Sequence, residues 1–450
     1  MDEDSDTTPK QPSEHKHSRH PQEGPHSARP RKPNPIKRFL SILGPGLITG
    51  AADDDPSGIA TYSIAGASLG FATLWTALLT LPLMSVVQYL CAKIGMVSGM
   101  GLGGVLRRHY SRSLLYPAVF LLLVANTINA GTDIGAIAAA INLLVPVPIV
   151  YLIVPIALLI VAVQFWGSYR LISGVFKWLT LALFAYIGAA FLAKPNWHEV
   201  ISATFVPRLS FDKTYLTTLV AILGTTISPY LFFWQASQEV EEEIRNGRQT
   251  IEERQGATYA ELRNAVLDTD VGMFICNLVF FFVIVAAAAT LHTHGKTNIQ
   301  SATDAAQALE PFAGAAAKYL FAVGLIGVGF LAVPVLTSSA AYAVAETFGW
   351  ECRLDDKPRE AKQFYLVIAA STLLGMLINF VGINPMSALF WTAVINGLVS
   401  PPLLVVIMLV SNNKKVMGDK VNGLATNVVG WAAAVVMVAA AIGLLVTWGD

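Results

Sequence analysis

Runs of about twenty apolar residues recur along the whole of this 450-residue sequence, and they limit its fold more than any other feature. One such run is long enough for a helix to cross a bilayer. Only 13% of the residues are charged, against roughly 25% in an ordinary soluble domain. The pattern therefore predicts an all-α, multi-pass membrane protein. We count eleven apolar segments, centred near residues 55, 82, 129, 158, 182, 227, 280, 328, 371, 399 and 436.

Positive charge predicts how these segments are oriented in a cell membrane. Lys and Arg occur in the N-terminal tail and in every second connection, whereas connections 66–71, 145–149 and 382–386 contain neither. Because the positive side faces the cytoplasm, we expect a cytoplasmic N-terminus. An odd number of spans then places the C-terminus outside. The positive residues of the connections are Arg107, Arg108, Arg170, Arg245, Arg248, Arg254, Arg263, Arg353, Lys357, Arg359, Lys362, Lys414, Lys415 and Lys420.

The chain divides into a polar tail and a membrane domain. Residues 1–38 are rich in His, Pro, Lys and Arg and contain no apolar stretch, which predicts a disordered cytoplasmic tail and not a signal peptide. Residues 39–450 form the expected transmembrane domain. The formal net charge is zero, so no nucleic-acid partner is expected.

Three acids and a proline interrupt the first apolar segment. Asp53, Asp54, Asp55 and Pro56 lie in the middle of the apolar stretch 39–67. Carboxylates at membrane depth cost several kcal/mol unless they face a cation or a wet cavity. Proline has no N–H to donate, so the helix is expected to break where the acids lie. A broken helix with acids at this depth is typical of the cation site of a transporter.

The sixth segment carries a similar interruption, because Pro229 and small polar residues break the apolar run at 224–230. The two broken segments, the first and the sixth, are five positions apart in the order of spans, as two inverted five-helix repeats would require. We predict the first repeat at about 39–193 and the second at about 214–411. A further helix at about 424–448 lies outside both repeats.

The two breaks together predict a metal site built from oxygen ligands. The two prolines free the carbonyls of Ala52 and Thr225, and freed carbonyls at membrane depth can coordinate an ion. With the Asp55 carboxylate and the Ser228 hydroxyl, they form a set that suits Mg²⁺, Mn²⁺ or Ca²⁺. Taken alone, Pro229 also fits an ordinary helix kink, and the two hydroxyls also fit bonds to their own helix.

Other polar residues at membrane depth have more than one interpretation. Asp53 and Asp54 cannot both face the ion that Asp55 holds, so we expect them to line a vestibule or to be protonated. Asp133, in the third segment, is a candidate proton relay or partner of a basic group, or alternatively a hydrogen-bonded packing residue. Asn126 lies on about the same helix face as Asp133.

The longest polar insert, residues 238–270, joins the sixth and seventh segments on the expected cytoplasmic side. It begins with an acidic run that contains Glu239, Glu241, Glu242 and Glu243. We interpret the insert as a solvated amphipathic helix, and a regulatory metal site is the alternative.

From residue 38 to residue 448 the sequence resembles the natural resistance-associated macrophage protein (NRAMP) family of divalent metal transporters. The resemblance implies an inverted-repeat bundle, Asp55 as a metal ligand, and transport of Mn²⁺ or Fe²⁺ with protons. The matching motifs are Gly44-Pro45-Gly46, Asp55-Pro56-Ser57-Gly58, 88–99, Thr132-Asp133 and 409–418.

The sequence departs from the family pattern at the site itself. Gly58 stands where the family has Asn, and Asn126 stands where it has Glu. In the sixth segment, Thr225, Ser228 and Tyr230 replace the family's Ala, Met and His. The thioether and the histidine associated with the proton route are therefore missing, and we expect a larger, harder and more acidic cavity. These changes are similar to those of the NRAMP-related magnesium transporter branch.

We therefore predict a monomeric, cofactor-free carrier of Mg²⁺ and Mn²⁺, with Fe²⁺ as a further candidate and with weak or absent proton coupling. An ordinary proton-coupled Mn²⁺/Fe²⁺ symporter is the first alternative. A Mg-dependent intramembrane prenyltransferase would need a second acidic cluster, which the apolar segments lack. An amino-acid symporter would repel its substrate carboxylate with the three acids, and a metal channel stays open as an alternative.

Overall fold

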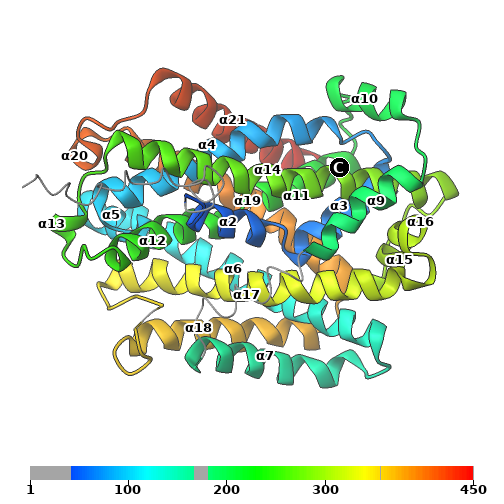
Figure 1. Ribbon diagram of the computed structural model, residues 1–450, viewed down its shortest axis with the longest axis horizontal. Helices are drawn as coiled ribbons and strands as arrows, with labels where there is room; N and C mark the ends of the chain where they lie inside the picture. The colour runs from blue at the N-terminus through cyan, green and yellow to red at the C-terminus, as the bar shows by residue number, and fades with distance from the viewer. Residues whose placement is uncertain (1–41, 167–180, 355, 449–450) are drawn as a thin grey trace, which may run out of the picture. The chain divides into compact units, whose positions relative to one another are not determined.

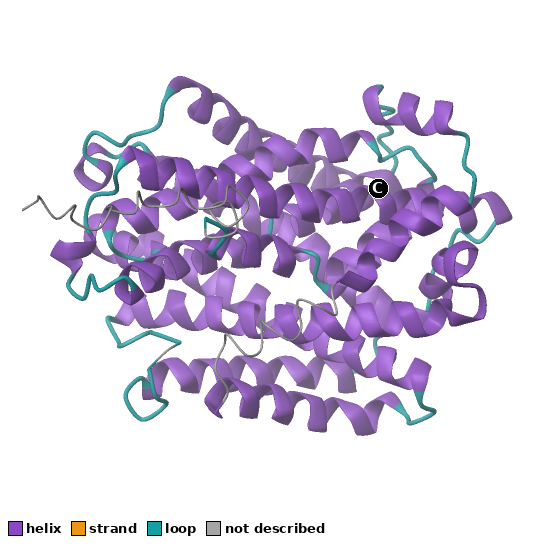
Figure 2. Cartoon of the chain, in the orientation of Figure 1, coloured by secondary structure: helices purple, strands orange, loops and turns teal. Residues whose placement is uncertain are grey.

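The computed structural model describes residues 42–166, 181–354 and 356–448, and every regular element in these ranges is a helix (Figures 1 and 2). Nine segments of this described part are long and apolar enough to cross a membrane. They contain α4 (Trp75–Ser98), α6 (Arg112–Leu144), α7 (Ile149–Trp166), α11 and α12 (Lys213–Thr226 and Pro229–Arg245, one segment), α14 (Tyr259–Thr290), α17 (Ala317–Phe348), α18 (Lys362–Met376), α19 (Pro385–Ser411) and α21 (Leu424–Trp448).

The first and fifth apolar segments are not among these nine. The first is divided into α2 (Pro45–Asp53) and α3 (Pro56–Leu69), each too short to span alone. The fifth is described only over Leu181–Leu192, which includes α9 (Ala185–Leu192), because residues 167–180 lie outside the described part. The all-helical membrane class is confirmed, and the count of eleven spans stays a prediction.

Shorter helices connect the long ones. They are α5 (Leu102–His109), α10 (Trp197–Phe205), α13 (Ile251–Arg254), α15 (Ala302–Ala306), α16 (Glu310–Ala313) and α20 (Lys414–Met417). The predicted tail, residues 1–38, lies outside the described residues.

The two predicted helix breaks are present, and their backbone geometry is similar. After α2, Asp54 has φ −77° and ψ 52°, and Asp55 is extended with φ −69° and ψ 169°. After α11, Ile227 has φ −118° and ψ 63°, and Ser228 is extended with φ −78° and ψ 128°. In both cases a proline then begins the second half-helix, where its missing N–H costs nothing.

The half-helix α2 packs unusually close to α14. A Cβ atom added to Gly50 would lie 2.3 Å from the carbonyl oxygen of Gly272, and one added to Gly272 would lie 2.3 Å from the carbonyl oxygen of Gly46. The Asp268 carboxylate of α14 also accepts the N–H groups of Gly44, Gly46 and Leu47, at 2.9, 2.7 and 3.0 Å. These N–H groups at the start of α2 have no intrahelical acceptor, so Asp268 both caps and anchors the half-helix.

Long helices surround the two breaks. The helix α6 packs along α17 and also contacts α18 and α19, while α11 packs on α19 and α3 packs on α14 (Figure 1). The side chains of Trp234, Tyr230 and Tyr62, which lie close to the breaks in sequence, are fully buried. The centre of the bundle is therefore protein-lined, as irregular backbone at membrane depth requires.

The interpretation of the acidic run as a solvated helix is wrong. The helix α12 continues through Arg245, and Glu239, Glu241 and Glu243 are all buried. Glu239 accepts from the Gln235 amide at 2.9 Å, and Glu241 accepts from the Tyr342 hydroxyl. Packing of α12 against α17 therefore overrides the solvation that the charge pattern suggested.

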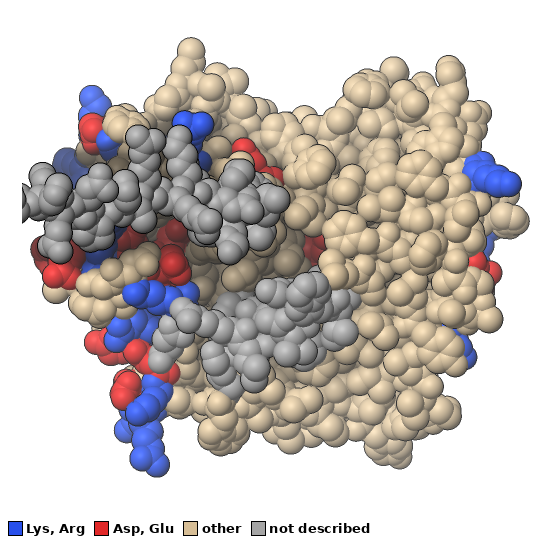
Figure 3. All heavy atoms as spheres, in the orientation of Figure 1, with Lys and Arg blue, Asp and Glu red and all other residues tan. Residues whose placement is uncertain are grey.

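Charged side chains gather at one end of the visible face. Figure 3 shows Lys, Arg, Asp and Glu around the end that carries α13 and α20, with a broad band of uncharged residues beside them. This distribution fits a membrane that covers the uncharged band.

We expect Gly50→Ala to lower stability, because its methyl group would collide with backbone atoms of Gly272 that cannot rotate away. Overpacking of this kind costs about 1–3 kcal/mol. The melting temperature of the detergent-purified protein measures the effect. Gly443→Ala is the matched control, since the nearest atoms to its added Cβ are 3.9 Å away. Equal melting temperatures for the two variants would contradict the close α2–α14 contact.

Candidate metal centre

Asp55 is held in position by bonds from two helices. It is the N-terminal cap of α3, and its Oδ1 accepts the Ser57 hydroxyl and the Gly58 N–H, each at 2.7 Å. Its Oδ2 accepts the side-chain amide of Asn129, on α6, at 3.1 Å. A carboxylate offers about four lone pairs, so these three bonds leave capacity for an ion. The predicted metal ligand is therefore buried, oriented and still able to coordinate.

Thr225, on α11, and Asp55 both lie close to Gly58. A Cβ atom added to Gly58 would lie 3.1 Å from the Thr225 hydroxyl oxygen and 3.5 Å from Asp55 Oδ1. The Thr225 hydroxyl is buried and has no hydrogen-bond partner among the described residues. The Thr225 oxygen therefore narrows the space that a side chain at residue 58 would enter, and the larger cavity expected at the site stays a prediction. The Asp55 carboxylate at the first break and the Thr225 hydroxyl near the second both lie beside Gly58.

Hydroxyl groups of α12 and its cap satisfy the freed carbonyls. The Tyr230 hydroxyl donates to the Ala52 carbonyl at 2.7 Å, and the Ser228 hydroxyl donates to the Thr225 carbonyl at 2.6 Å. A weaker contact at 3.3 Å joins the Ser228 hydroxyl to the carbonyl of Gly224. The structure thus shows the local back-bond that was the alternative role for Ser228. Each carbonyl oxygen has a second lone pair, so a bound ion is compatible with these bonds.

Asp53 and Asp54 face a different helix from Asp55. Their Oδ2 and Oδ1 atoms lie 3.1 and 3.3 Å from the Cys276 sulfur on α14. Both residues are buried, with exposures of 0% and 5%, so they do not line a solvent-exposed vestibule in this conformation, and the alternative that they are protonated stays a prediction. Sequence reasoning missed Cys276 because it stands alone, with no ligand spacing around it. Asp53 and Asp54 thus share the Cys276 thiol, while electrostatic interactions link both to Asp55, and Asp53 also interacts with the Ser228 hydroxyl.

Asp133 is buried without a partner for either carboxyl oxygen among the described residues. It lies within electrostatic range of Asp55. The interpretation as a hydrogen-bonded packing residue is therefore not supported here. Asn126 donates to the Leu336 carbonyl on α17 at 3.1 Å, so its amide group is bound to another helix.

Side-chain ligands alone do not complete a metal site in the described part of the chain, where no group of three or more His, Cys, Asp or Glu residues is arranged to hold an ion. The oxygen atoms near Asp55 are instead the Asn129 side-chain carbonyl, which has no hydrogen-bond partner among the described residues, hydroxyls and backbone carbonyls. Oxygen donors of this kind suit hard divalent cations.

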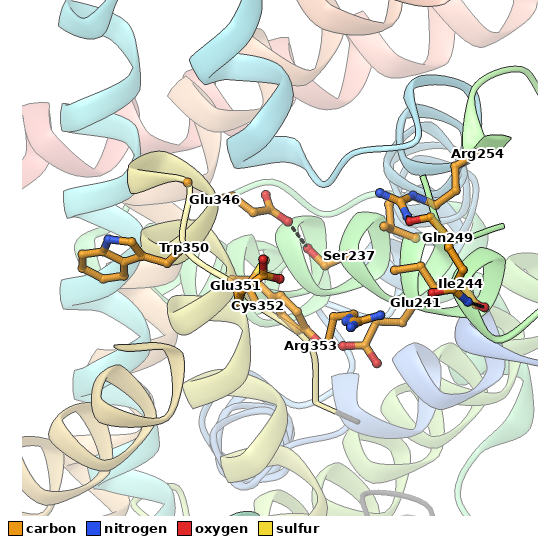
Figure 4. Close-up of a pocket in the computed structure, with 13 residues that line it drawn as sticks. Ser237, Glu241, Ile244, Gln249, Arg254, Glu346, Trp350, Glu351, Cys352 and Arg353 are labelled. Carbon is orange, nitrogen blue, oxygen red and sulfur yellow. Dashed lines mark hydrogen bonds between the residues drawn. The ribbon is translucent and has the colours of Figure 1, made fainter. Parts of the chain in front are cut away.

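A separate cavity of about 310 Å³ lies between α12 and α17. Figure 4 shows Glu346 and Ser237 joined across it by a hydrogen bond of 2.9 Å, with Arg254 and Arg353 also on the lining. Ser237 is eight residues beyond Pro229, which is about 12 Å along the helix axis. The cavity is thus at the charged end of the bundle and not at the helix breaks.

Comparison with known proteins assigns the family. The Natural resistance-associated macrophage protein-like family matches residues 46–447. This chain belongs to the NRAMP family. The match covers both helix breaks, Asp133 and the final apolar segment, so the resemblance seen in the sequence is confirmed.

Individual relatives of this NRAMP chain agree with the assignment. The Divalent metal cation transporter MntH of Deinococcus radiodurans is 28% identical over 422 residues, which is 90% of each chain. The protein of the same name from Caldanaerobacter subterraneus is 24% identical and covers 85% of this chain and 87% of its own. A crystal structure of the Eremococcus coleocola manganese transporter has a TM-score of 0.74 at 18% identity and covers 92% of this chain and 88% of its own, which confirms the fold. These relatives are transporters and not enzymes.

We expect Asp55→Asn to weaken Mn²⁺ binding by about tenfold or more, because it removes the carboxylate that caps α3 beside the Thr225 hydroxyl. Asp53→Asn is the comparison variant, since its carboxyl group contacts the Cys276 thiol and does not cap α3. Calorimetric titration of the purified protein measures both affinities. An equal loss in the two variants would show that the three acids act as one site.

Proposed function

We propose that this chain carries Mg²⁺ and Mn²⁺ across the plasma membrane by alternating access. The observation that carries the proposal is the oriented, buried Asp55 carboxylate, which lies where two broken helices bring oxygen donors together. The relatives support divalent metals as the substrate class, because they are described as divalent metal cation or manganese transporters.

The donor set supports a hard ion. Ser228 presents a hydroxyl where the family pattern has a thioether, and this hydroxyl lies 2.6 Å from the Thr225 carbonyl. Tyr230 likewise presents a phenol in place of an imidazole and bonds to Ala52. Mg²⁺ and Mn²⁺ favour carboxylate, carbonyl and water ligands, whereas softer ions favour sulfur. We therefore infer that the loss of a soft sulfur ligand allows this site to bind Mg²⁺.

Proton coupling is proposed to be weak or absent, because Tyr230 cannot titrate as a histidine does near neutral pH. A second candidate function is the proton-coupled Mn²⁺/Fe²⁺ symporter. It is favoured by one observation, namely that Asp133 is buried, has no hydrogen-bond partner among the described residues, and lies within electrostatic range of Asp55. Uphill metal uptake driven by an imposed pH gradient in liposomes would select the symporter.

The proposed architecture has eleven spans, with two inverted repeats and one additional helix. The similar backbone geometry of the two breaks supports it, since each has a bent residue, an extended cap and then a proline. The distribution of Lys and Arg supports a cytoplasmic N-terminus and an extracytoplasmic C-terminus. We propose that the monomer is the working unit.

We expect Ser228→Met to lower Mg²⁺ uptake while preserving or raising Mn²⁺ and Cd²⁺ uptake, because it returns a soft, bulky ligand to the site. Proteoliposomes loaded with ion-sensitive dyes measure the three fluxes. Ser228→Ala is the matched control, since it removes the hydroxyl without adding sulfur. If Ser228→Met leaves the ratio of Mg²⁺ to Mn²⁺ flux unchanged, the proposed basis of selectivity is wrong.

A further inference from the structure

A basic pocket lies at the charged end of the bundle, away from the metal site. It has a volume of about 390 Å³ and is formed by α4, by the start of α14 and by the connection that leads into α21. These elements pack together at the end of the molecule that carries α20 (Figure 1). The charged and aromatic residues that line the pocket are Tyr89, Lys93, Tyr259, Arg263, Asp419 and Lys420.

Lys93 gives the pocket a buried cation that has no paired carboxylate. Only 3% of Lys93 is exposed, and its ammonium group donates to the Asn422 side-chain oxygen at 2.6 Å. It also lies 5.7 Å from the centre of the Tyr89 ring. No carboxylate in the described part of the chain lies within 4.0 Å of it. A buried charge without a counter-charge is costly, so this site favours an anion.

The other charges of the pocket add to this preference. Arg263 is exposed and forms no ion pair with a described residue. Lys420 lies 3.4 Å from the centre of the Tyr259 ring and pairs at 3.0 Å with Asp419, whose side chain is 76% exposed. The Lys420 side chain is only 13% exposed, and its exposed partner Asp419 is held by an ion pair that contributes little stability. Three cations therefore share the pocket with one weakly held carboxylate.

A helix N-terminus completes the anion-binding character. The helix α21 begins at Leu424, and Gly423 and Thr426 on either side of that point line the pocket. The first N–H groups of a helix have no intrahelical acceptor and carry partial positive charge. Phosphate groups bind readily at such positions.

The surface next to the pocket is apolar, which distinguishes a lipid from a soluble anion. Tyr259 and Arg263 lie one turn apart on α14, and Leu267 and Phe274 continue the same helix face. Leu267 is 38% exposed and Phe274 is 53% exposed. Cationic and tyrosine side chains at the interface, followed by exposed apolar side chains, match the headgroup and acyl chains of one lipid.

We propose that this pocket binds the phosphate group of an anionic phospholipid, with the acyl chains along the exposed face of α14. The proposal does not depend on which ion the protein transports. Lys93 and the start of α21 would hold the phosphate, while Arg263 and Lys420 would close around it.

The test measures binding of phosphatidylglycerol to the full-length chain in detergent by native mass spectrometry. The test variant is Arg263→Gln with Lys420→Gln, which leaves the buried Lys93 in place. The matched control is Lys414→Gln with Lys415→Gln, because both lysines are exposed, are on the same side and are not on the pocket lining. We expect the test variant to lose about tenfold or more in affinity and the control to lose little.

Two further ligands distinguish an anionic lipid from a neutral lipid and from a soluble phosphate. Phosphatidylcholine, which has the same phosphate and chains but no net charge, should bind at least about fivefold more weakly than phosphatidylglycerol. Free glycerol phosphate should fail to displace the bound lipid at the same concentration. Equal binding of the two lipids, displacement by glycerol phosphate, or an equal loss in the control variant would each overturn the proposal.

Discussion

The centre of this protein depends on the need to satisfy backbone groups that two broken helices leave unpaired inside a membrane. Lipid offers no hydrogen bonds, so a break at this depth requires protein groups around it. The hydroxyl groups of Tyr230 and Ser228 donate to the carbonyls of Ala52 and Thr225. At the start of α3, the Asp55 carboxylate accepts a backbone N–H. These bonds also hold the carboxylate, hydroxyl and carbonyl oxygen atoms close together. The groups that satisfy the broken backbone are therefore the same groups that form the candidate cation site.

The half-helix α2 connects this site to the rest of the bundle. Its start is capped by Asp268 and its glycines pack directly on the α14 backbone, while its end carries Asp53 and Asp54 toward Cys276. All these contacts are with α14. Movement of α2 would therefore change the Asp268 cap, the glycine contacts and the two acids together.

Sequence alone predicts the helix breaks, because proline interrupts the helix in both segments and three acids at membrane depth have no obvious structural use. The sequence also predicts Asp55 as a metal ligand, because a carboxylate at membrane depth is costly unless it faces a cation or water. It could not predict partners far away in the chain, such as Cys276 for Asp53 or Asn129 for Asp55. The acidic run of α12 was misjudged for the same reason: Glu241 is buried because Tyr342 and the Leu354 N–H reach it from α17 and the loop that follows. Local charge patterns do not contain that information.

The most direct test of the account is the position of the bound ion. Anomalous diffraction from crystals soaked in Mn²⁺ would locate it without reference to transport rates. We expect a peak within about 2.5 Å of an Asp55 carboxyl oxygen and beside the Thr225 or Ala52 carbonyl. A peak at Asp53, Asp54 and Cys276, with none at Asp55, would contradict the proposal that the ion is held by oxygen atoms between the two breaks.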